Sequence, residues 1–459
     1  MYKINFEKPI HIHFIGIGGI SMSGLAEILL EEGFTVSGSD SKESPLTKKL
    51  ESEGAIIHYG QCAENISDGI DCVVYTAAIN KANPELMEAV ARKIPMLTRA
   101  ELLGQLMKNY KTPIAVSGTH GKTTTTSMIS LCFLEADLDP SVQVGAMLKD
   151  IGGNYRVGNS DFFILEACEY VESFLKFSPQ SAVVTNIDND HLDYFKTFDN
   201  IKHAFEKYVN LLPKDGFLVT NADDPDCLSL RKNTSAKVIT FGIQNGKANF
   251  VGRNIVYDAN GFAKFDVYRN NSYFGEFKLS VPGLHNVYNA LACIAMCSNY
   301  GIAKQILKTA LLKFRGANRR FEYIGSYSNI DVYDDYAHHP SEIAATAKAM
   351  KNKPYRQSWV VFQPHTYSRT KELLSDFAEA LLDFDNIIVT DIYAARETNT
   401  YGICSKDLVN KINEYGKNAL YISNFDDIAS YIRGHACPHD LILTMGAGTV
   451  WEIGKKILE

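Results

Sequence analysis

The stretch Ile114-Ala-Val-Ser-Gly-Thr-His-Gly-Lys-Thr-Thr124 decides the fold of this chain. An apolar run leads into a glycine-rich turn, which opens a helical stretch that extends to about Glu135. The backbone N–H groups of such a turn and of the helix N-terminus can hold phosphate groups. Lys122 is placed to contact the β- and γ-phosphates, and Thr123 offers a hydroxyl to Mg²⁺. The residues predicted to bind ATP here are Gly118, Thr119, His120, Gly121, Lys122, Thr123 and Thr124.

The spacing of this loop differs from the common phosphate-loop pattern, which has four residues between its two glycines. Val116 stands where the first glycine of that pattern is expected. An ordinary glycine-rich turn between a strand and a helix is therefore the alternative interpretation. The Gly-Lys-Thr-Thr that follows an apolar strand favours ATP binding.

Polar residues follow the next two apolar runs. Glu166 follows residues 162–165, and a cluster from Asn186 to His191 follows residues 182–184. The carboxyl ends of parallel strands meet at one edge of a sheet, which is where ligands bind. Carboxylate oxygens suit Mg²⁺, whereas His191 would be an unusual ligand for this ion. Together with the phosphate loop, the two clusters indicate a magnesium-dependent ATP site rather than two solvated loops.

The N-terminal turn, Gly16-Ile-Gly-Gly-Ile-Ser21, is similar to a second nucleotide-binding pattern. Ser21 replaces the third glycine of that pattern, and Asp40 ends the next strand, where an acidic residue can bind a ribose. This turn alone leaves a nicotinamide-dependent dehydrogenase open as an alternative. A dehydrogenase would, however, leave the loop at Gly118 unexplained.

Amide side chains lie at the start of a helix that is expected to begin near Asn286. His285, Asn286 and Asn289 are placed where side chains can contact the edge of a purine. The alternative is a plain capping role for the asparagines.

Three groups in the last third of the chain indicate a site for a second substrate. Arg319 and Arg320 could neutralise a phosphoryl group during its transfer. His338, within the polar stretch 334–342, could orient or deprotonate an amine, and Arg369 could hold a carboxylate. Each group alone is typical of structural residues, but together they favour a binding site.

The 459 residues are enough for about three domains. Strands alternate with helices, which predicts an α/β fold. We expect a Rossmann-like N-terminal domain at 1–110, a central ATP-binding P-loop domain at 111–315, and a Rossmann-like C-terminal domain at 316–459.

The composition of the chain excludes several classes of function. The net charge is −7, which disfavours nucleic-acid binding. No run approaches about 20 apolar residues, so we expect no membrane segment. The nine cysteines are scattered without a Cys-x-x-Cys, and no third or fourth ligand is expected near Cys293 and Cys297. We therefore expect buried thiols in a reducing cytoplasm and no zinc site.

These motifs, in this order and over essentially the whole chain, resemble those of the Mur ligase family, the ATP-dependent amide-forming enzymes of peptidoglycan synthesis. The resemblance implies ATP and Mg²⁺ as cofactors, and a C-terminal domain that brings in the amino acid. The resemblance implies Glu166 and His191 as metal ligands, to which the loop adds Thr123. It implies Asn286 as an adenine contact, and we also assign His285 and Asn289 to the ATP site. It places Gly18, Gly19 and Asp40 in the UDP-binding region, to which we also assign Ser39. The implied catalytic residues are Lys122, His191, Arg319, Arg320, His338 and Arg369.

Within the family, the chain resembles the members that join L-alanine to UDP-N-acetylmuramate through an acyl phosphate. The alternative is the members that join a ready-made tripeptide to the same sugar nucleotide. Tyr336 and Phe321 favour the alanine-specific members. Cys168 and Thr366 depart from the family pattern, which usually has a carboxylate and an arginine there. We expect a monomer or homodimer.

Overall fold

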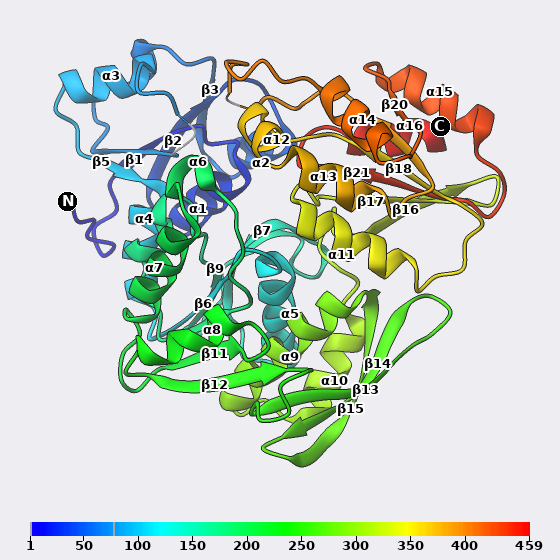
Figure 1. Cartoon of the computed structure of the whole chain (residues 1–459). Helices are drawn as coiled ribbons and strands as arrows, with labels where there is room; N and C mark the ends of the chain where they lie inside the picture. Colours follow the sequence, from blue (N-terminus) through cyan, green and yellow to red (C-terminus); the bar gives the residue numbers. More distant parts are fainter. Residues whose placement is uncertain (1, 77–78, 396) are drawn as a thin grey trace. The chain divides into compact units, whose positions relative to one another are not determined.

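The computed structural model describes residues 2–76, 79–395 and 397–459. The chain forms two compact units. Unit 1 comprises residues 1–189, 197–241 and 292–306, and unit 2 comprises residues 190–196, 242–291 and 307–459. Strands alternate with helices along most of the described chain, which confirms the predicted α/β class (Figure 1). Among the described residues, no helix is both long enough and apolar enough to cross a membrane.

The N-terminal sheet of unit 1 has five parallel strands in the order β3-β2-β1-β4-β5. The sequence pattern predicts a strand at 35–37; in the structure this strand, β2, continues to Asp40, and its Gly38 pairs with Phe14 of β1. A Cβ atom at position 38 would lie 2.7 Å from the backbone oxygen of Phe14, so this close approach requires glycine. The elements are β1 His11–Ile15, α1 Ile20–Glu31, β2 Thr35–Asp40, α2 Pro45–Ser52, β3 Ile56–Tyr59, η1 Ala63–Asn65, β4 Cys72–Tyr75, α3 Pro84–Ala91, β5 Met96–Thr98, α4 Arg99–Leu106 and η2 Met107–Asn109.

The second sheet of unit 1 carries the phosphate loop. Its strands follow the order β12-β11-β10-β6-β9-β7-β8, and only the β7–β8 pair among these is antiparallel in the described residues. The order places β6 between β9 and β10, so the loops that follow these three strands leave the same edge of the sheet. The elements are β6 Thr112–Ser117, α5 Lys122–Glu135, β7 Ser141–Leu148, η3 Lys149–Ile151, β8 Gly153–Arg156, β9 Phe162–Glu166, η4 Tyr170–Lys176, β10 Ser181–Val184, α7 Phe198–Val209, β11 Phe217–Asn221, α8 Pro225–Ser229, η5 Leu230–Lys232 and β12 Lys237–Gly242.

Helix α5, which follows the phosphate loop, is buried over nearly its whole length. It carries hydroxyl side chains in the core, and these are hydrogen-bonded within the helix. Thr126 Oγ1 donates to the carbonyl of Lys122 and Ser130 Oγ donates to the carbonyl of Thr126, both at 2.8 Å. Burying a hydroxyl costs little when it has such a partner. The helix therefore fixes the loop at its N-terminus to the core of unit 1.

Residues 250–282 of unit 2 form three antiparallel strands, β13, β14 and β15, connected by turns at 260–261 and 270–271. The pairs Asn260-Gly261 and Asn270-Asn271 in the sequence predict both turns. Helix α9 begins at Leu284, two residues before the expected start, and its residues from Ala292 onward lie in unit 1. The elements are α6 Leu192–Phe195, β13 Phe250–Tyr257, β14 Phe262–Arg269, β15 Ser272–Pro282, α9 Leu284–Asn299 and α10 Lys304–Lys313.

The C-terminal sheet of unit 2 has the order β16-β17-β21-β18-β19-β20, in which β16 is antiparallel to β17 and the other pairs are parallel. The sequence pattern predicts one helix at 370–382, and this prediction is wrong, because the structure has two helices there. Leu373, with φ −104° and ψ 24°, separates α12 from α13. The elements are β16 Glu322–Tyr327, β17 Ile330–Asp335, α11 Pro340–Met350, β18 Ser358–Phe362, α12 Tyr367–Glu372, α13 Leu374–Leu381, β19 Asn386–Val389, α14 Ser405–Glu414, β20 Ala419–Tyr421, α15 Phe425–His435, β21 Leu441–Met445 and α16 Trp451–Leu458.

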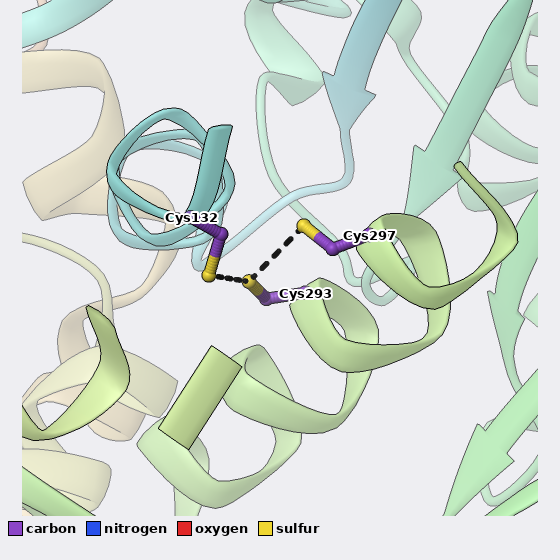
Figure 2. Close-up of side chains that lie close together, drawn as sticks. All are labelled: Cys132, Cys293 and Cys297. Carbon is purple, nitrogen blue, oxygen red and sulfur yellow. Dashed lines mark hydrogen bonds between the residues drawn. The ribbon is translucent and has the colours of Figure 1, made fainter. Parts of the chain in front are cut away.

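The expectation about Cys293 and Cys297 needs one correction. Both are buried free thiols, as predicted, but a third sulfur does lie nearby. The Sγ atom of Cys132, on α5, is 3.6 Å from that of Cys293 (Figure 2). Cys132 is 161 residues away in the sequence, so no local spacing could indicate this contact.

Candidate active site

The phosphate loop connects β6 to α5, and its shape depends on two glycines. Gly118 has φ +134° and Gly121 has φ +82°, conformations that L side chains rarely adopt. A Cβ atom at Gly118 would lie 2.0 Å from Oγ1 of Thr185, on the neighbouring loop after β10. The turn is therefore tight and its backbone lies close to that loop.

The loop after β10 braces the phosphate loop through hydrogen bonds. The Asn186 side chain accepts from the backbone N–H of His120 at 2.8 Å and donates to its carbonyl at 2.9 Å. Thr185 Oγ1 donates to the same carbonyl at 2.6 Å. The sequence indicated Asn186 as part of a polar cluster but not this bracing role, which fixes the loop before any ligand binds.

Lys122 lies at the centre of this region. Its Nζ atom is 2.9 Å from Oε2 of Glu169, whose side chain is only 2% exposed. Nζ also donates to the carbonyl oxygens of Gly118 and Thr119. Burial opposes the charge on Lys122, but Glu169, Cys168 and Glu166 together outweigh it, and the pKa of Lys122 is raised above its usual value. Lys122 is therefore an ammonium ion, and Glu169 is a partner that the sequence analysis missed.

Two of the three predicted metal ligands meet at the edge of this sheet. Thr123 Oγ1 donates to Oε2 of Glu166 at 3.2 Å, and the other carboxylate oxygen accepts from the backbone N–H of Gly145. A hydroxyl beside a carboxylate is an all-oxygen set, which fits Mg²⁺. His191 lies in unit 2, before α6, with Nε2 3.7 Å from the carboxylate of Asp190. Its place among the metal ligands stays a prediction.

The predicted UDP-sugar residues surround the turn between β1 and α1. The backbone N–H groups of Gly16 and Ile17 donate to the carbonyl of Ser39, and that of Gly18 donates to Oδ2 of Asp40 at 2.9 Å. Gly19 is the N-cap residue of α1. Hydrogen bonds thus join the turn to the end of β2, and Asp40 accepts one of them from the backbone of the turn.

A buried carboxylate, which the sequence analysis missed, lies next to this turn. The Ser39 hydroxyl donates to Oε2 of Glu85 at 2.6 Å, and Asn65 Nδ2 donates to Oε1 at 2.5 Å. Burial opposes ionisation, but the hydrogen bonds from Ser39 and Asn65 and the nearby ring of His13, whose Nε2 is 3.6 Å away, lower the pKa of Glu85. Glu85 is therefore ionised, and it fixes the side chain of Ser39.

The predicted adenine contacts lie in the first two turns of α9, in unit 2. Asn286 Nδ2 donates to the carbonyl of Pro282 at 2.7 Å, and Asn289 Nδ2 donates to Oδ1 of Asn286 at 3.1 Å. His285 is exposed beside them. The two amides are thus held in fixed orientations.

The two adjacent arginines of unit 2 have different surroundings. Arg319 donates from Nε to Asp334 at 2.7 Å, and its two terminal nitrogens donate to the carbonyls of Gly448 and Gly446. Arg320 has a looser ion pair, 3.8 Å from Glu342. Every nitrogen of the Arg319 side chain is bonded to the protein, so Arg320 is better placed to contact a phosphate.

His338 and Arg369 have partners in unit 2. Nδ1 of His338 donates to the carbonyl of Tyr336 at 2.9 Å, and burial lowers the pKa of His338 to about 4. A neutral imidazole with Nδ1 protonated presents a basic Nε2. Arg369 donates from Nη2 to Asp190 at 2.9 Å and lies 3.2 Å from Nδ1 of His365. The carboxylate of Asp190 thus occupies the position beside Arg369 that we predicted for the carboxylate of a substrate.

The chain matches known protein families, and the matched domains follow the order of the sequence motifs. Three family profiles match the chain: "Mur ligase family, catalytic domain" at residues 11–111, "Mur ligase middle domain" at 116–297, and "Mur ligase, glutamate ligase domain" at 319–448. Together they cover most of the chain, in the order in which the sequence motifs occur.

Similar proteins extend over the full length. A relative from Acetivibrio thermocellus, named UDP-N-acetylmuramate–L-alanine ligase, is 53% identical over 98% of this chain and 96% of its own. The solved structure of UDP-N-acetylmuramate-alanine ligase from Thermotoga maritima has a TM-score of 0.84 at 31% identity and covers 98% of both chains. A murein peptide ligase from Psychrobacter arcticus has a TM-score of 0.74 at 25% identity, again over 98% of both. The predicted three-domain α/β fold is confirmed, and the chain belongs to the Mur ligase family.

Proposed function

We propose that this chain forms the amide bond between the carboxylate of UDP-N-acetylmuramate and the amine of L-alanine, with conversion of ATP to ADP and phosphate. The observation that carries the proposal is the 53% identity, over nearly the whole chain, to the Acetivibrio thermocellus ligase of that name. A shared fold alone does not fix a function, so the proposal also rests on the chemistry of the residues at the site.

The phosphate loop supports the role of ATP. Gly118 and Gly121 allow the tight turn. The N–H groups of Thr119 and His120 are bonded to Asn186, and the N-terminus of α5 offers backbone N–H groups to phosphate oxygens. Lys122 supplies a fixed positive charge at the same place. These groups stabilise the charge that develops on a transferring phosphoryl group.

We propose that Thr123, Glu166 and His191 hold Mg²⁺. When bound, the ion would draw charge from the phosphate oxygens and orient them. Glu166 is positioned for this by the N–H of Gly145, which occupies its other oxygen. The protein therefore holds the carboxylate of Glu166 in position before the metal ion binds.

The reaction that we propose has two steps. The lactyl carboxylate attacks the γ-phosphate of ATP and gives an acyl phosphate with release of ADP. The neutral amine of alanine then attacks the acyl carbonyl, and phosphate leaves. Lys122 and Arg320 offset the phosphate charge, while His338, whose Nδ1 donates to the carbonyl of Tyr336, presents Nε2 as the acceptor of a proton from the amine. His285, Asn286 and Asn289 are assigned to the adenine, and Gly18, Gly19, Ser39 and Asp40 to the UDP group.

We further propose that residues 1–110, 111–315 and 316–459 bind the sugar nucleotide, ATP and the amino acid, respectively, and that the reaction takes place in the cytoplasm. The main alternative is ligation of a tripeptide to the same sugar nucleotide; the Psychrobacter arcticus neighbour is named a murein peptide ligase. Its identity to this chain is 25%, against 53% for the alanine ligase.

Product analysis tests the choice of amino acid. The purified protein is incubated with UDP-N-acetylmuramate, ATP, Mg²⁺ and either L-alanine or L-alanyl-γ-D-glutamyl-meso-diaminopimelate, and the products are identified by mass spectrometry. We expect the alanyl product with a kcat/KM at least a hundredfold above that for the tripeptide. Efficient ligation of the tripeptide but not of alanine would contradict the proposal.

A further inference from the structure

Three buried thiols meet between two helices of unit 1. Cys132 lies on α5, and Cys293 and Cys297 lie one turn apart on α9, and each has an exposed fraction of 0% (Figure 2). The Sγ atoms of Cys132 and Cys293 are 3.6 Å apart, those of Cys293 and Cys297 are 3.8 Å apart, and all three lie within 4.8 Å of one another. None of them belongs to the site described above.

The sulfur separations match those around a single bound ion. Three sulfurs that are each about 2.3 Å from one centre lie about 3.8 Å apart in a tetrahedral arrangement and about 4.0 Å apart in a planar one. They lie closer together when the ion sits above their plane, as in a pyramid. The two measured separations fall in this range, so only small side-chain rotations would bring the three sulfurs to a common ion.

The donor set selects a soft ion of low coordination number. Within the described part of the chain, no fourth His, Cys, Asp or Glu side chain joins the group. Thiolates prefer soft, thiophilic ions. The residues next to these cysteines, such as Phe133 and Ile294, are buried and apolar, so a site with a net charge would be costly.

We propose that Cys132, Cys293 and Cys297 form a binding site for one trivalent thiophilic ion, such as arsenic(III). One As(OH)₃ and three thiols give one As(S-Cys)₃ and three waters. Three As–O and three S–H bonds break, three As–S bonds and three O–H bonds form, and no atom is oxidised or reduced. The product is neutral, as the apolar surroundings require, whereas a divalent ion with three thiolates would leave a buried negative charge.

The surroundings of Cys132 favour the first step. Hydrogen bonds with Cys293 and Cys297 lower the pKa of the Cys132 thiol although burial opposes this. All three sulfurs are buried, so the ion enters only when the helices open locally. We expect binding to be slow and to speed up on warming. Once bound, the ion would join the phosphate-loop helix to the helix that carries Asn286 and Asn289.

Mass spectrometry of the intact, folded protein tests the proposal. The full-length chain is reduced, freed of metals with a chelator and incubated with arsenite. We expect one arsenic per chain and the loss of three protons, since exposed single thiols such as Cys62 and Cys404 cannot supply three sulfurs to one ion. X-ray absorption should show three As–S bonds. No adduct, or an adduct held by one or two sulfurs, would overturn the proposal.

Substitutions identify the cysteines that bind. Cys293→Ala should weaken arsenite binding at least tenfold and abolish the three-proton adduct. Cys227→Ala, which removes an equally buried cysteine outside the cluster, should leave both unchanged. Equal binding by the two variants would contradict the assignment. Circular dichroism checks that each variant is folded; if Cys293→Ala is not, the wild-type proton count and As–S coordination still decide the question.

Discussion

The ammonium group of Lys122 lies 2.9 Å from the carboxylate of Glu169, which is almost completely buried. Lys122, the cation of the phosphate loop, is therefore paired with a carboxylate of the protein before a nucleotide binds. Binding of a nucleotide would add phosphate oxygens to the partners of Lys122, next to an existing carboxylate. The pair keeps Lys122 charged and oriented, and it makes the loop sensitive to the loss of either residue.

Replacing Lys122 should reduce both activity and stability. In Lys122→Met the buried carboxylate of Glu169 loses its counter-ion, which typically costs about 3–5 kcal/mol. Turnover should fall at least a thousandfold, because a charge that stabilises the phosphoryl group is lost. Urea unfolding and phosphate release measure the two effects.

The double variant Lys122→Met/Glu169→Gln isolates the pair. It should recover at least half of the lost stability but none of the activity. Lys111→Met, which removes one partner of an exposed ion pair with Asp161, serves as a control and should change stability by less than about 1 kcal/mol. If Lys122→Met is as stable as the wild type, the buried pair does not have the energetic role described.

Glu166→Gln should weaken the response to Mg²⁺. The amide keeps the shape of the side chain and can still accept from Gly145, but it removes a negatively charged ligand. The Mg²⁺ concentration for half-maximal activity should rise at least tenfold. Glu172→Gln, which changes an ion pair with Lys207 on the surface, should leave this concentration unchanged. An unaltered Mg²⁺ dependence in Glu166→Gln would exclude Glu166 as a ligand.

The two arginines should differ when each is replaced by lysine. Arg319→Lys loses the planar group that bonds Asp334 and two carbonyls, so we expect about 2–4 kcal/mol less stability. Arg320→Lys should keep stability within about 1 kcal/mol and lower kcat at least tenfold. Thermal unfolding and steady-state kinetics of both variants test this. The opposite pattern would assign the phosphate contact to Arg319.

Glu27, on α1, should make stability depend on pH. Burial raises the pKa of Glu27 to about 7, against 4.5 in the unfolded chain, even though Lys49 lies 2.7 Å away. The folded protein thus holds a proton that the unfolded chain has lost. Its stabilising effect is full below about pH 4.5 and is lost as the pH rises through about 7.

Comparison of Glu27→Gln with the wild type measures this effect. Between pH 5 and pH 8 the wild type should lose about 1–2 kcal/mol more than the variant, a figure below the full shift because the partner Lys49 is partly exposed. Glu43→Gln, in an exposed pair with Lys48, should follow the wild type. Urea unfolding at both pH values checks this, and parallel curves for Glu27→Gln and the wild type would refute it.

Much of the site could be predicted because its signals are local. The turn at Gly118–Thr124 and the polar residues after β9 and β10 are each contiguous in sequence, and parallel pairing brings them to one edge. Glu169 could not be assigned to Lys122, because the two residues are 47 positions apart and the chain between them includes three strands, β7, β8 and β9, with no fixed spacing. The contacts of Glu85 and Cys132 could not be predicted for the same reason, because their partners are distant in the sequence. The break at Leu373 has no glycine or proline to indicate it.

The transfer of an oxygen atom tests the central claim most directly. UDP-N-acetylmuramate with ¹⁸O in its lactyl carboxylate is incubated with the protein, ATP, Mg²⁺ and L-alanine, and the released phosphate is analysed by mass spectrometry. Activation of the carboxylate as an acyl phosphate leaves one of its oxygens on phosphate, so we predict one ¹⁸O in each phosphate released. Alanyl product accompanied by unlabelled phosphate would contradict the account.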